Sequence, residues 1–574
     1  MVNIVTDIKK VRIMAVLKGI ETRFATHIPK TDCTPDYHLI KEQHHMQEPD
    51  GMINIIPAVR LVADYQRPIW VTKPDKRNHK QKKEYTQEEN TFKVMTTQSD
   101  LYDVAAKKLG LYTNNFRTVT ASPYLYGADI SAATIIKKVG DDLAAKTLGE
   151  STGFTVAVLD TEAVTVGTKK FTKDGDLTIC SVLMHGRAHI AITKAYLKGI
   201  KEPEANIRYL ADKYIGDYLT KHQIRNDFDI VVYDNELDAV KSCFDKIHLW
   251  KPDFVALWNL DYDITKILDI CTKYDYRPED LFSDPMVPVE ARKFKYTRDK
   301  ELSITAAGVY KPKKFHEQWH KLFCASSFLV VDAASIFYQC RMGEPKQKSY
   351  SLDYILKLII KRGKLKFEKA DHLSYGAWHE YMQVNYPLEY VVYNIFDCLG
   401  ILDLDSVTQD MAVAFPLQVG VKPYHKAPSL PQAALVDLNF FAQDICYVYG
   451  TTGGELKNEF TEATLACSGW IIALDAHLVM AIGEPNVIVE NTGRRHGIHT
   501  HVVDMDIVSA YPKGTICYGL GAPNIIKEIV SIGDIPEYVF KLQNINLSSG
   551  AANAVEYCEV MFGFPSLAEL EALV

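Results

Sequence analysis

The sequence has little of what marks a zinc-binding, secreted or membrane-embedded protein. Its 11 cysteines are scattered over 574 residues and none form a Cys-x-x-Cys pair, so we expect no zinc site. Cys180 and Cys271 lie in apolar runs and are expected to be small core residues. No apolar stretch is long enough to span a bilayer, and residues 1–10 lack the apolar region of a signal peptide. These absences favour a cytoplasmic protein with no membrane partner.

The chain also lacks a positive net charge. A formal charge of −7 argues against a protein that coats DNA, but not against a nucleic-acid enzyme, because local patches bind phosphates. One segment, bordered by Trp70 and Tyr85, is strongly basic. Both a nucleic-acid contact and an ordinary solvated loop fit it. Its basic residues are Arg67, Lys73, Lys76, Arg77, His79, Lys80, Lys82 and Lys83.

The length predicts several domains, because single hydrophobic cores stop growing well below this size. Between residues 151 and 410, short β-branched runs alternate with segments of helical apolar spacing, which predicts an α/β domain with a mixed sheet. Strands are predicted at 154–159, 229–233, 254–258 and 328–331. Helices are predicted from Leu237, Val240, Phe244 and Ile247, with Pro252 beyond as a stop signal, and from Ile264, Ile267, Leu268 and Cys271.

Two carboxylates end the first of these strands. Asp160 and Glu162 are two residues apart, so both side chains point to one face if the strand continues through Glu162. A third carboxylate, Asp397, lies four residues after Tyr393 on a helix for which Pro387 suits the first turn.

A fourth carboxylate, Asp263, lies where a strand gives way to a helix, and a helix cap is its alternative role. A stable core does not gather four carboxylates without a cation. Mg²⁺ and Mn²⁺ prefer oxygen ligands, and two such ions can stabilise the attacking and leaving oxygens of a phosphodiester cleavage. Each of these carboxylate motifs is common by itself, but their combination in one chain predicts metal-dependent phosphodiester cleavage.

The three motifs, at residues 160–162, 259–263 and 393–397, resemble the Exo I, Exo II and Exo III motifs of the proofreading 3′→5′ exonuclease of family B DNA polymerases. Residues 250–253, 348–355 and 363–366 are similar to the T4-like phage members of that family. The resemblance implies a ribonuclease H-like exonuclease domain that binds two divalent ions, Mg²⁺ or Mn²⁺. The implied metal ligands are Asp160, Glu162, Asp263 and Asp397, with Tyr393 positioning the attacking water and Asn259 holding the substrate strand.

One spacing departs from the family pattern. The usual distance from the Exo II asparagine to the metal-binding aspartate is one residue longer than from Asn259 to Asp263. Asp261 therefore competes for the ligand role. We favour Asp263, because it follows Tyr262 as the family's aspartate follows an aromatic residue.

A second resemblance lies near the end of the chain. Alternating Val503, Met505 and Ile507 predict a half-buried strand, and Asp506-Ile507-Val508-Ser509-Ala510-Tyr511-Pro512 resembles polymerase motif A. The resemblance implies that Asp506 binds Mg²⁺ at a completed polymerase site, that Tyr511 closes the sugar pocket and that Ser509 contacts substrate. Ala510, Lys513 and Gly514 depart from the pattern.

No fingers helix or second palm carboxylate follows motif A in the sequence. A polymerase needs the second carboxylate to hold two metal ions and the cationic fingers side chains to neutralise the nucleoside triphosphate. We therefore expect the exonuclease-bearing N-terminal subunit of a split polymerase, or a truncated product. The expected fold is an α/β and α+β multidomain protein. It comprises an N-terminal domain at 1–150, completed by about 411–495, the exonuclease domain at 151–410, and a partial palm at 496–574. Residues 418–432 are expected to be a connection.

The expected partners are primer-template and single-stranded DNA, a C-terminal polymerase subunit docking on an apolar interface near 430–574, and a sliding clamp. Of the basic segment, Arg67, Lys73, Lys76, Arg77 and Lys80 are the expected DNA contacts. Two alternatives stay open: a stand-alone 3′→5′ exonuclease and a non-enzymatic nucleic-acid-binding regulator.

Overall fold

The computed structural model describes residues 16–77, 85–148, 153–164, 175–224, 228–304, 309–368, 370, 372–414, 430–453, 487–489 and 494–496. The chain divides into two compact units. The first 150 residues contribute to both of them, so the expected boundary near residue 150 does not separate the units. Unit 1 comprises Met1–Pro68, Met95–Leu101 and Ile130–Phe441; unit 2 comprises Ile69–Val94, Tyr102–Asp129 and Ala442–Val574.

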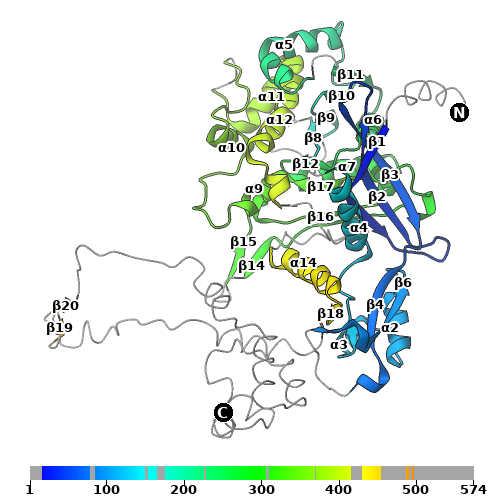
Figure 1. Cartoon of the computed structure of the whole chain (residues 1–574). Helices are drawn as coiled ribbons and strands as arrows, with labels where there is room; N and C mark the ends of the chain where they lie inside the picture. Colours follow the sequence, from blue (N-terminus) through cyan, green and yellow to red (C-terminus); the bar gives the residue numbers. More distant parts are fainter. Residues whose placement is uncertain are drawn as a thin grey trace, which may run out of the picture. The chain divides into compact units, whose positions relative to one another are not determined.

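A six-stranded mixed sheet forms the centre of unit 1 (Figure 1). Its order is β11-β10-β9-β8-β12-β17. β8 is antiparallel to β9 and parallel to β12, while β12 is parallel to β17. β10 is antiparallel to β9 and parallel to β11. The strands are β8 (Val156–Ala163), β9 (Leu177–Met184), β10 (Arg187–Thr193), β11 (Phe228–Tyr233), β12 (Phe254–Leu257) and β17 (Leu329–Asp332).

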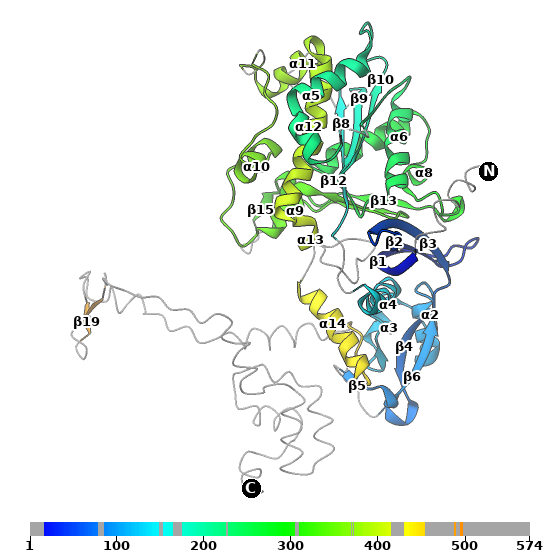
Figure 2. The same cartoon turned by 45° about the horizontal axis from the view of Figure 1, so that its top comes forward.

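Helices cover both faces of this sheet, as Figure 2 shows with α5 and α12 on one side and α6 on the other. Val158 of β8 packs in the core beneath α5 and α12, whereas its neighbours Ala157 and Leu159 pack with α6 and α7. Because successive side chains of a strand point to opposite faces of the sheet, β8 contributes residues to the hydrophobic cores on both sides. The helices are α5 (Pro203–Lys221), α6 (Glu236–Trp250), α7 (Leu260–Lys273), α8 (Pro278–Phe282), α9 (Ala333–Cys340), α10 (Leu352–Ile359), α11 (Tyr375–Asn385), α12 (Pro387–Thr408) and α13 (Asp410–Ala414).

Most of the predicted elements of this domain are present. Strands β11, β12 and β17 and helices α6 and α7 lie where the sequence places them, and Cys180 and Cys271 are buried core residues. The prediction for β8 was wrong at its end: the strand runs through Ala163, because β9 pairs with it that far. Strands β9 and β10 were not predicted. β9 is buried along nearly its whole length and so lacks an alternating pattern.

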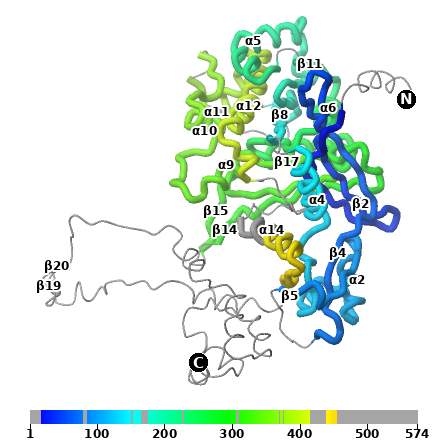
Figure 3. The backbone as a smooth tube through the Cα atoms, viewed as in Figure 1, coloured from blue at the N-terminus to red at the C-terminus, as the bar shows by residue number. Residues whose placement is uncertain are grey.

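A three-stranded antiparallel sheet, order β1-β2-β3, also belongs to unit 1. Ile28 and Leu39 of this sheet pack with Val287 and Ala325. Figure 3 traces the backbone, in which α4 and β8 follow these strands after the segments that belong to unit 2. The remaining elements of unit 1 are β1 (Val16–Ile28), β2 (Tyr37–Gln47), β3 (Ile53–Ala63), α4 (Ala132–Thr147), and the antiparallel pairs β13 (Phe294–Thr297) with β16 (Lys321–Cys324) and β14 (Leu302–Ile304) with β15 (Tyr310–Pro312).

A buried ionic cluster joins the three-stranded sheet to the residue that precedes β12. Asp253 is fully buried, and Lys41 Nζ lies 3.1 Å from its Oδ1 while Arg23 Nη2 lies 3.6 Å from its Oδ2. The Thr155 amide and hydroxyl both donate to Oδ2, at 2.8 and 2.9 Å. Burial opposes ionisation, but Lys41 and Arg23 hold the pKa of Asp253 below its ordinary value.

Unit 2 contains a small sheet of order β6-β4-β7 and a β18-β5 pair around buried Trp70, Tyr126 and Val448. Gly127 has φ +70°, and a Cβ there would lie 2.6 Å from the Trp70 ring, so glycine is required. The elements are β4 (Arg67–Thr72), β5 (Tyr85–Gln87), β6 (Thr91–Thr96), α2 (Leu101–Leu109), α3 (Phe116–Ala121), β7 (Leu125–Tyr126) and β18 (Tyr447–Tyr449), with β19 (Val487–Val489) and β20 (Arg494–His496) farther along the chain.

Helix α14 (Leu430–Asp444) begins inside the connection expected at 418–432, so that expectation was wrong for its last three residues. Among the described helices, none has the length and apolar character that crossing a bilayer requires.

Candidate metal centre

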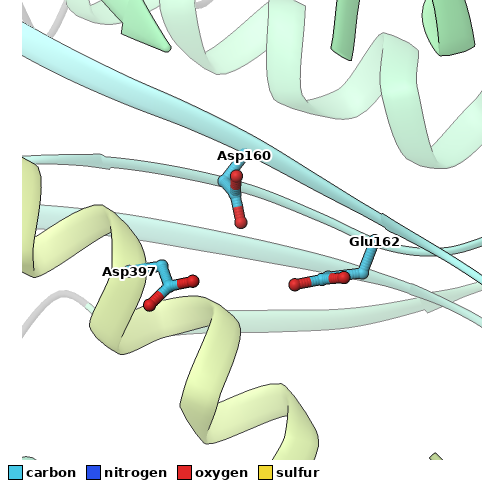
Figure 4. Close-up of side chains that lie close together, drawn as sticks. All are labelled: Asp160, Glu162 and Asp397. Atoms are coloured by element: carbon cyan, nitrogen blue, oxygen red, sulfur yellow. The ribbon is translucent and has the colours of Figure 1, made fainter. Parts of the chain in front are cut away.

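Strand β8 and helix α12 bring three carboxylates together. Asp160 and Glu162 lie on the face of β8 that α12 covers, and Asp397 projects from α12 toward them (Figure 4). One oxygen from each of the three lies within 4.8 Å of the others. Glu162 and Asp397 are buried, and Asp160 is half-buried. Because β8 continues through Glu162, the condition that the sequence set for a shared face is met.

Asp263 lies beside this cluster and is hydrogen-bonded to Thr161, which lies between Asp160 and Glu162 on β8. Its Oδ1 accepts hydrogen bonds from the Thr161 amide at 3.1 Å and the Thr161 hydroxyl at 2.6 Å. Because β12 ends at Leu257, the Thr161 amide has no strand carbonyl of β12 beside it. The Asp263 carboxylate accepts the hydrogen bond from that amide instead.

Asp261 is directed elsewhere. It accepts hydrogen bonds from the Tyr296 hydroxyl at 2.7 Å and from Arg298 Nε at 2.6 Å. Asp263 therefore lies beside the three carboxylates, whereas Asp261 is bonded away from them. Asp263 is not the helix cap that the sequence left open, because Asp332 accepts from the Leu260 amide at the start of α7, at 3.0 Å.

A single lysine enters the cluster among the described residues. Lys364 Nζ donates to Asp397 Oδ2 and, at 2.8 Å, to the hydroxyl oxygen of Tyr393. The other oxygen, Asp397 Oδ1, is buried and has no hydrogen-bond partner in the described part of the chain. Four carboxylates therefore share one ammonium group, and one buried carboxylate oxygen is unsatisfied.

Burial raises the pKa values of all four carboxyl groups, and repulsion from nearby carboxylates adds to the effect. Burial is the larger cause for Asp160, whose pKa lies well above its ordinary value, followed by the charges of Asp263, Glu162 and Asp397. Burial raises the pKa of Glu162 to about 8 and that of Asp263 to about 7. The pKa of Asp397 is raised by burial although Lys364 opposes the shift.

This donor set fits a hard divalent cation. The ligands are carboxylate oxygens, one of them buried and unsatisfied, and their charge exceeds that of the one lysine. A bound cation would favour the ionised forms and lower the same pKa values. Asp160, Glu162 and Asp397 would hold it directly, with Asp263 adjacent.

The other predicted site residues divide into two groups. Asn259 is half-buried at the N-cap of α7, and its backbone carbonyl accepts from the Tyr262 amide at 3.1 Å. Tyr393 is buried on the same face of α12 as Asp397. The motif A residues Asp506, Ser509 and Tyr511, and the basic residue Lys80, lie outside the described residues, as does the strand expected around them.

The basic segment is partly internal. Arg67, an expected DNA contact, is fully buried and donates to Gln98 and to the Pro68 carbonyl, so its guanidinium is not exposed at the surface. Arg77 donates to the Thr72 and Lys108 carbonyls and lies over the Tyr124 ring. Its guanidinium is thus largely occupied by the fold. Lys73 is half-buried and Lys76 is exposed.

Sequence reasoning assigned no role to Lys364, Tyr390 or Asn394. Tyr390, Tyr393, Asn394 and Asp397 are spaced at 0, 3, 4 and 7 along α12, which places them on one helix face. Polar groups at that spacing in an otherwise apolar helix were the available signal. Lys364 comes from a loop after α10, and only the fold brings it to the cluster.

Comparison of the sequence with models of known protein families gives no match, and comparison with curated proteins also gives none.

Proposed function

We propose that unit 1 is a metal-dependent 3′→5′ exonuclease and that the chain is the N-terminal part of a family B DNA polymerase. The observation that carries the exonuclease is the convergence of Asp160, Glu162 and Asp397, with Asp263 beside them and one lysine for compensation. The mixed sheet covered by helices on both faces supports a ribonuclease H-like exonuclease domain.

The chemistry follows from the groups that surround the cluster. Bound Mg²⁺ or Mn²⁺ would polarise the phosphodiester and lower the pKa of a water molecule. The Lys364 ammonium donates to the Tyr393 oxygen and so fixes the phenol beside the cluster, where it would orient that water. Lys364 also places a positive charge where negative charge develops in the transition state. Asn259 would hold the substrate strand at the start of α7.

The polymerase part of the proposal depends on the motif A resemblance at residues 506–512. One Asp does not hold two ions against a triphosphate, so nucleotide addition would need a second chain with fingers, the rest of the palm and thumb. Primer-template DNA would be the shared substrate, and a mismatched 3′ end, which unpairs more easily, would reach the exonuclease site more often.

The test is shortening of a 5′-labelled single-stranded oligonucleotide by the purified chain in Mg²⁺. The expected products are ladders shortened from the 3′ end with release of deoxynucleoside monophosphates. Asp160→Ala combined with Glu162→Ala should lower the rate by at least about 10⁴-fold, because such groups act as a unit, while DNA binding is retained. Substantial Mg²⁺-dependent cleavage by this double variant would overturn the site assignment.

Asp261 and Asp263 supply a matched pair of controls on the same helix turn. Asp263→Ala should lose cleavage, whereas Asp261→Ala should retain it, because Asp261 is bonded to Tyr296 and Arg298 instead. Adding a candidate polymerase subunit and deoxynucleotides then tests the second part. If the primer is extended only when the second chain is present, a split polymerase is supported. If the primer is shortened and no added partner restores extension, a stand-alone exonuclease is the better interpretation.

A further inference from the structure

Helix α12 carries two buried polar side chains that contact the strand carboxylates but are not ligand candidates themselves. Tyr390 donates its hydroxyl hydrogen to Glu162 Oε2 at 2.6 Å, and Asn394 Nδ2 donates to Asp160 Oδ2 at 2.7 Å. Both side chains are completely buried. Each bond occupies one oxygen of a carboxylate, and the second oxygen of each is left for a cation.

Each of these two donors is itself held by a buried partner. Ser181 of β9 donates to Asn394 Oδ1, which fixes the amide so that its nitrogen faces Asp160. His379 Nδ1 lies 2.8 Å from the Tyr390 hydroxyl oxygen. Since that hydroxyl gives its only hydrogen to Glu162, His379 Nδ1 carries the proton and donates it to the phenol.

We infer that Tyr390 and Asn394 are positioning residues that preorganise Glu162 and Asp160 for divalent cations, with His379 and Ser181 as their supports. The inference rests on the proposed function of the site. The donors fix the orientation of two carboxylates that repel each other and would otherwise rotate apart. Neutral donors do this without cancelling the charge that attracts the cation.

The placement explains why α12 is polar at these positions. Tyr390 and Asn394 are separated by one helical turn, and β8 presents Glu162 and Asp160 two residues apart. One turn of helix rises about 5.4 Å and two strand residues span about 6.6 Å, so the two pairs are nearly in register. A single helix face therefore aligns both carboxylates at once.

The experiment measures Mn²⁺ binding to the full chain without DNA, by calorimetry and by the electron paramagnetic resonance of free Mn²⁺. Tyr390→Phe and Asn394→Leu remove one donor each with little change of shape. Each should weaken Mn²⁺ binding by about 10- to 100-fold, as loss of a group that orients a metal ligand does. Tyr196→Phe is the matched control, because the Tyr196 hydroxyl donates to the Pro387 carbonyl in the same core and to no carboxylate.

Substitution of His379 separates positioning from simple packing. His379→Asn keeps an N–H near the Nδ1 position and should retain Mn²⁺ binding, whereas His379→Leu has a similar shape without a donor and should weaken it. Circular dichroism and thermal unfolding verify that each variant is folded. The His379 pair serves as the test if Tyr390→Phe does not fold.

The outcomes distinguish this inference from the function on which it rests. Binding of Mn²⁺ by Tyr390→Phe and Asn394→Leu within twofold of the parent chain, or equal weakening by His379→Asn and His379→Leu, overturns the positioning role alone. Absence of Mn²⁺ binding by the parent chain, or binding unchanged in Glu162→Gln, overturns the metal centre and the inference together.

Discussion

Unit 1 contains two groups of buried carboxylates that differ in what neutralises them. Asp253 is surrounded by Lys41, Arg23 and the donors of Thr155, and its pKa lies below the ordinary value. The cluster of Asp160, Glu162, Asp263 and Asp397 shares Lys364, and its pKa values are raised. Asp253 is fully buried, and Glu162, Asp263 and Asp397 are buried as well. The fold supplies the counter-charge in the first place, whereas in the second it supplies one lysine for four carboxylates, so that a cation could provide the rest.

This difference is the one expected between a structural acid and a functional one. A buried carboxylate with its own cations is compensated within the fold, and its removal would leave those cations buried without a counter-charge. A buried group of carboxylates without them costs stability, and such sites persist where the charge is used. Neither the number of acids nor their burial makes this distinction; the positions of the neighbouring cations do.

The largest change in stability is expected from Asp253→Ala. Its loss leaves Arg23 and Lys41 buried near each other without their shared anion, which should cost about 3–5 kcal/mol of unfolding free energy. Asp217→Ala is the control, because Asp217 pairs with Arg362 at the surface and should cost less than about 1 kcal/mol. Urea unfolding monitored by fluorescence measures both. Equal losses in the two variants would contradict the comparison.

The pH dependence of the metal-free protein should follow Glu162. Its pKa is 4.5 in the unfolded chain and about 8 in the fold, so the folded state holds the proton more tightly. The stability that this provides is complete below pH 4.5 and is lost as the pH rises through about 8, by about 1.4 kcal/mol per pH unit between these two values. Urea unfolding in EDTA at pH 5, 6.5 and 8 measures it. Glu162→Gln should make the profile shallower, because Asp160, Asp263 and Asp397 still contribute, and an unchanged slope in that variant counts against the assignment.

Addition of Mg²⁺ should reverse that loss. A cation that binds only the folded state stabilises it by about 2.7 kcal/mol at a concentration 100 times its Kd, and the gain should be larger at pH 8 than at pH 5. Thermal unfolding with and without Mg²⁺ measures the shift. The Asp160→Ala, Glu162→Ala double variant is the control. A shift of the same size in that variant would place the Mg²⁺ effect outside the cluster.

The smallest effects are expected from the two neighbouring aspartates of α7. Asp263→Asn should stabilise the metal-free protein at pH 8 by about 1 kcal/mol, because it removes one of four repelling charges. Asp261→Asn should destabilise it by up to about 1 kcal/mol, because it weakens the bonds to Arg298 and Tyr296. Urea unfolding should give changes in unfolding free energy of opposite sign for the two variants. Changes of the same sign would contradict the difference between the uncompensated and the paired aspartate.

Much of the α/β domain could be predicted from periodicity. The apolar positions of α6 and α7 and the short runs of β11, β12 and β17 carry local signals, and the structure confirms them. The two-residue spacing of Asp160 and Glu162 already placed them on one face. The full length of β8 could not be predicted, because pairing with β9 extends it, and β9 itself lacks alternation.

The roles of single polar residues divide in the same way. Arg67 resembled a surface cation in the sequence, but the fold buries it against Gln98. Lys364 reaches Asp397 from 33 residues away, and Asn394 meets Ser181 from 213 residues away. Such partners are separated by chain lengths over which no local pattern survives.

The sequence by itself determined the kinds of groups and their local spacing: paired carboxylates on a strand, and a tyrosine, an asparagine and an aspartate on one helix face. Only the tertiary structure decided which acids are compensated. Asp253 and Asp160 belong to the same α/β domain, yet Lys41 reaches one and Lys364 is shared among the others. Charges interact through space over a few ångströms, and the distances that set their strength exist only once the chain is folded.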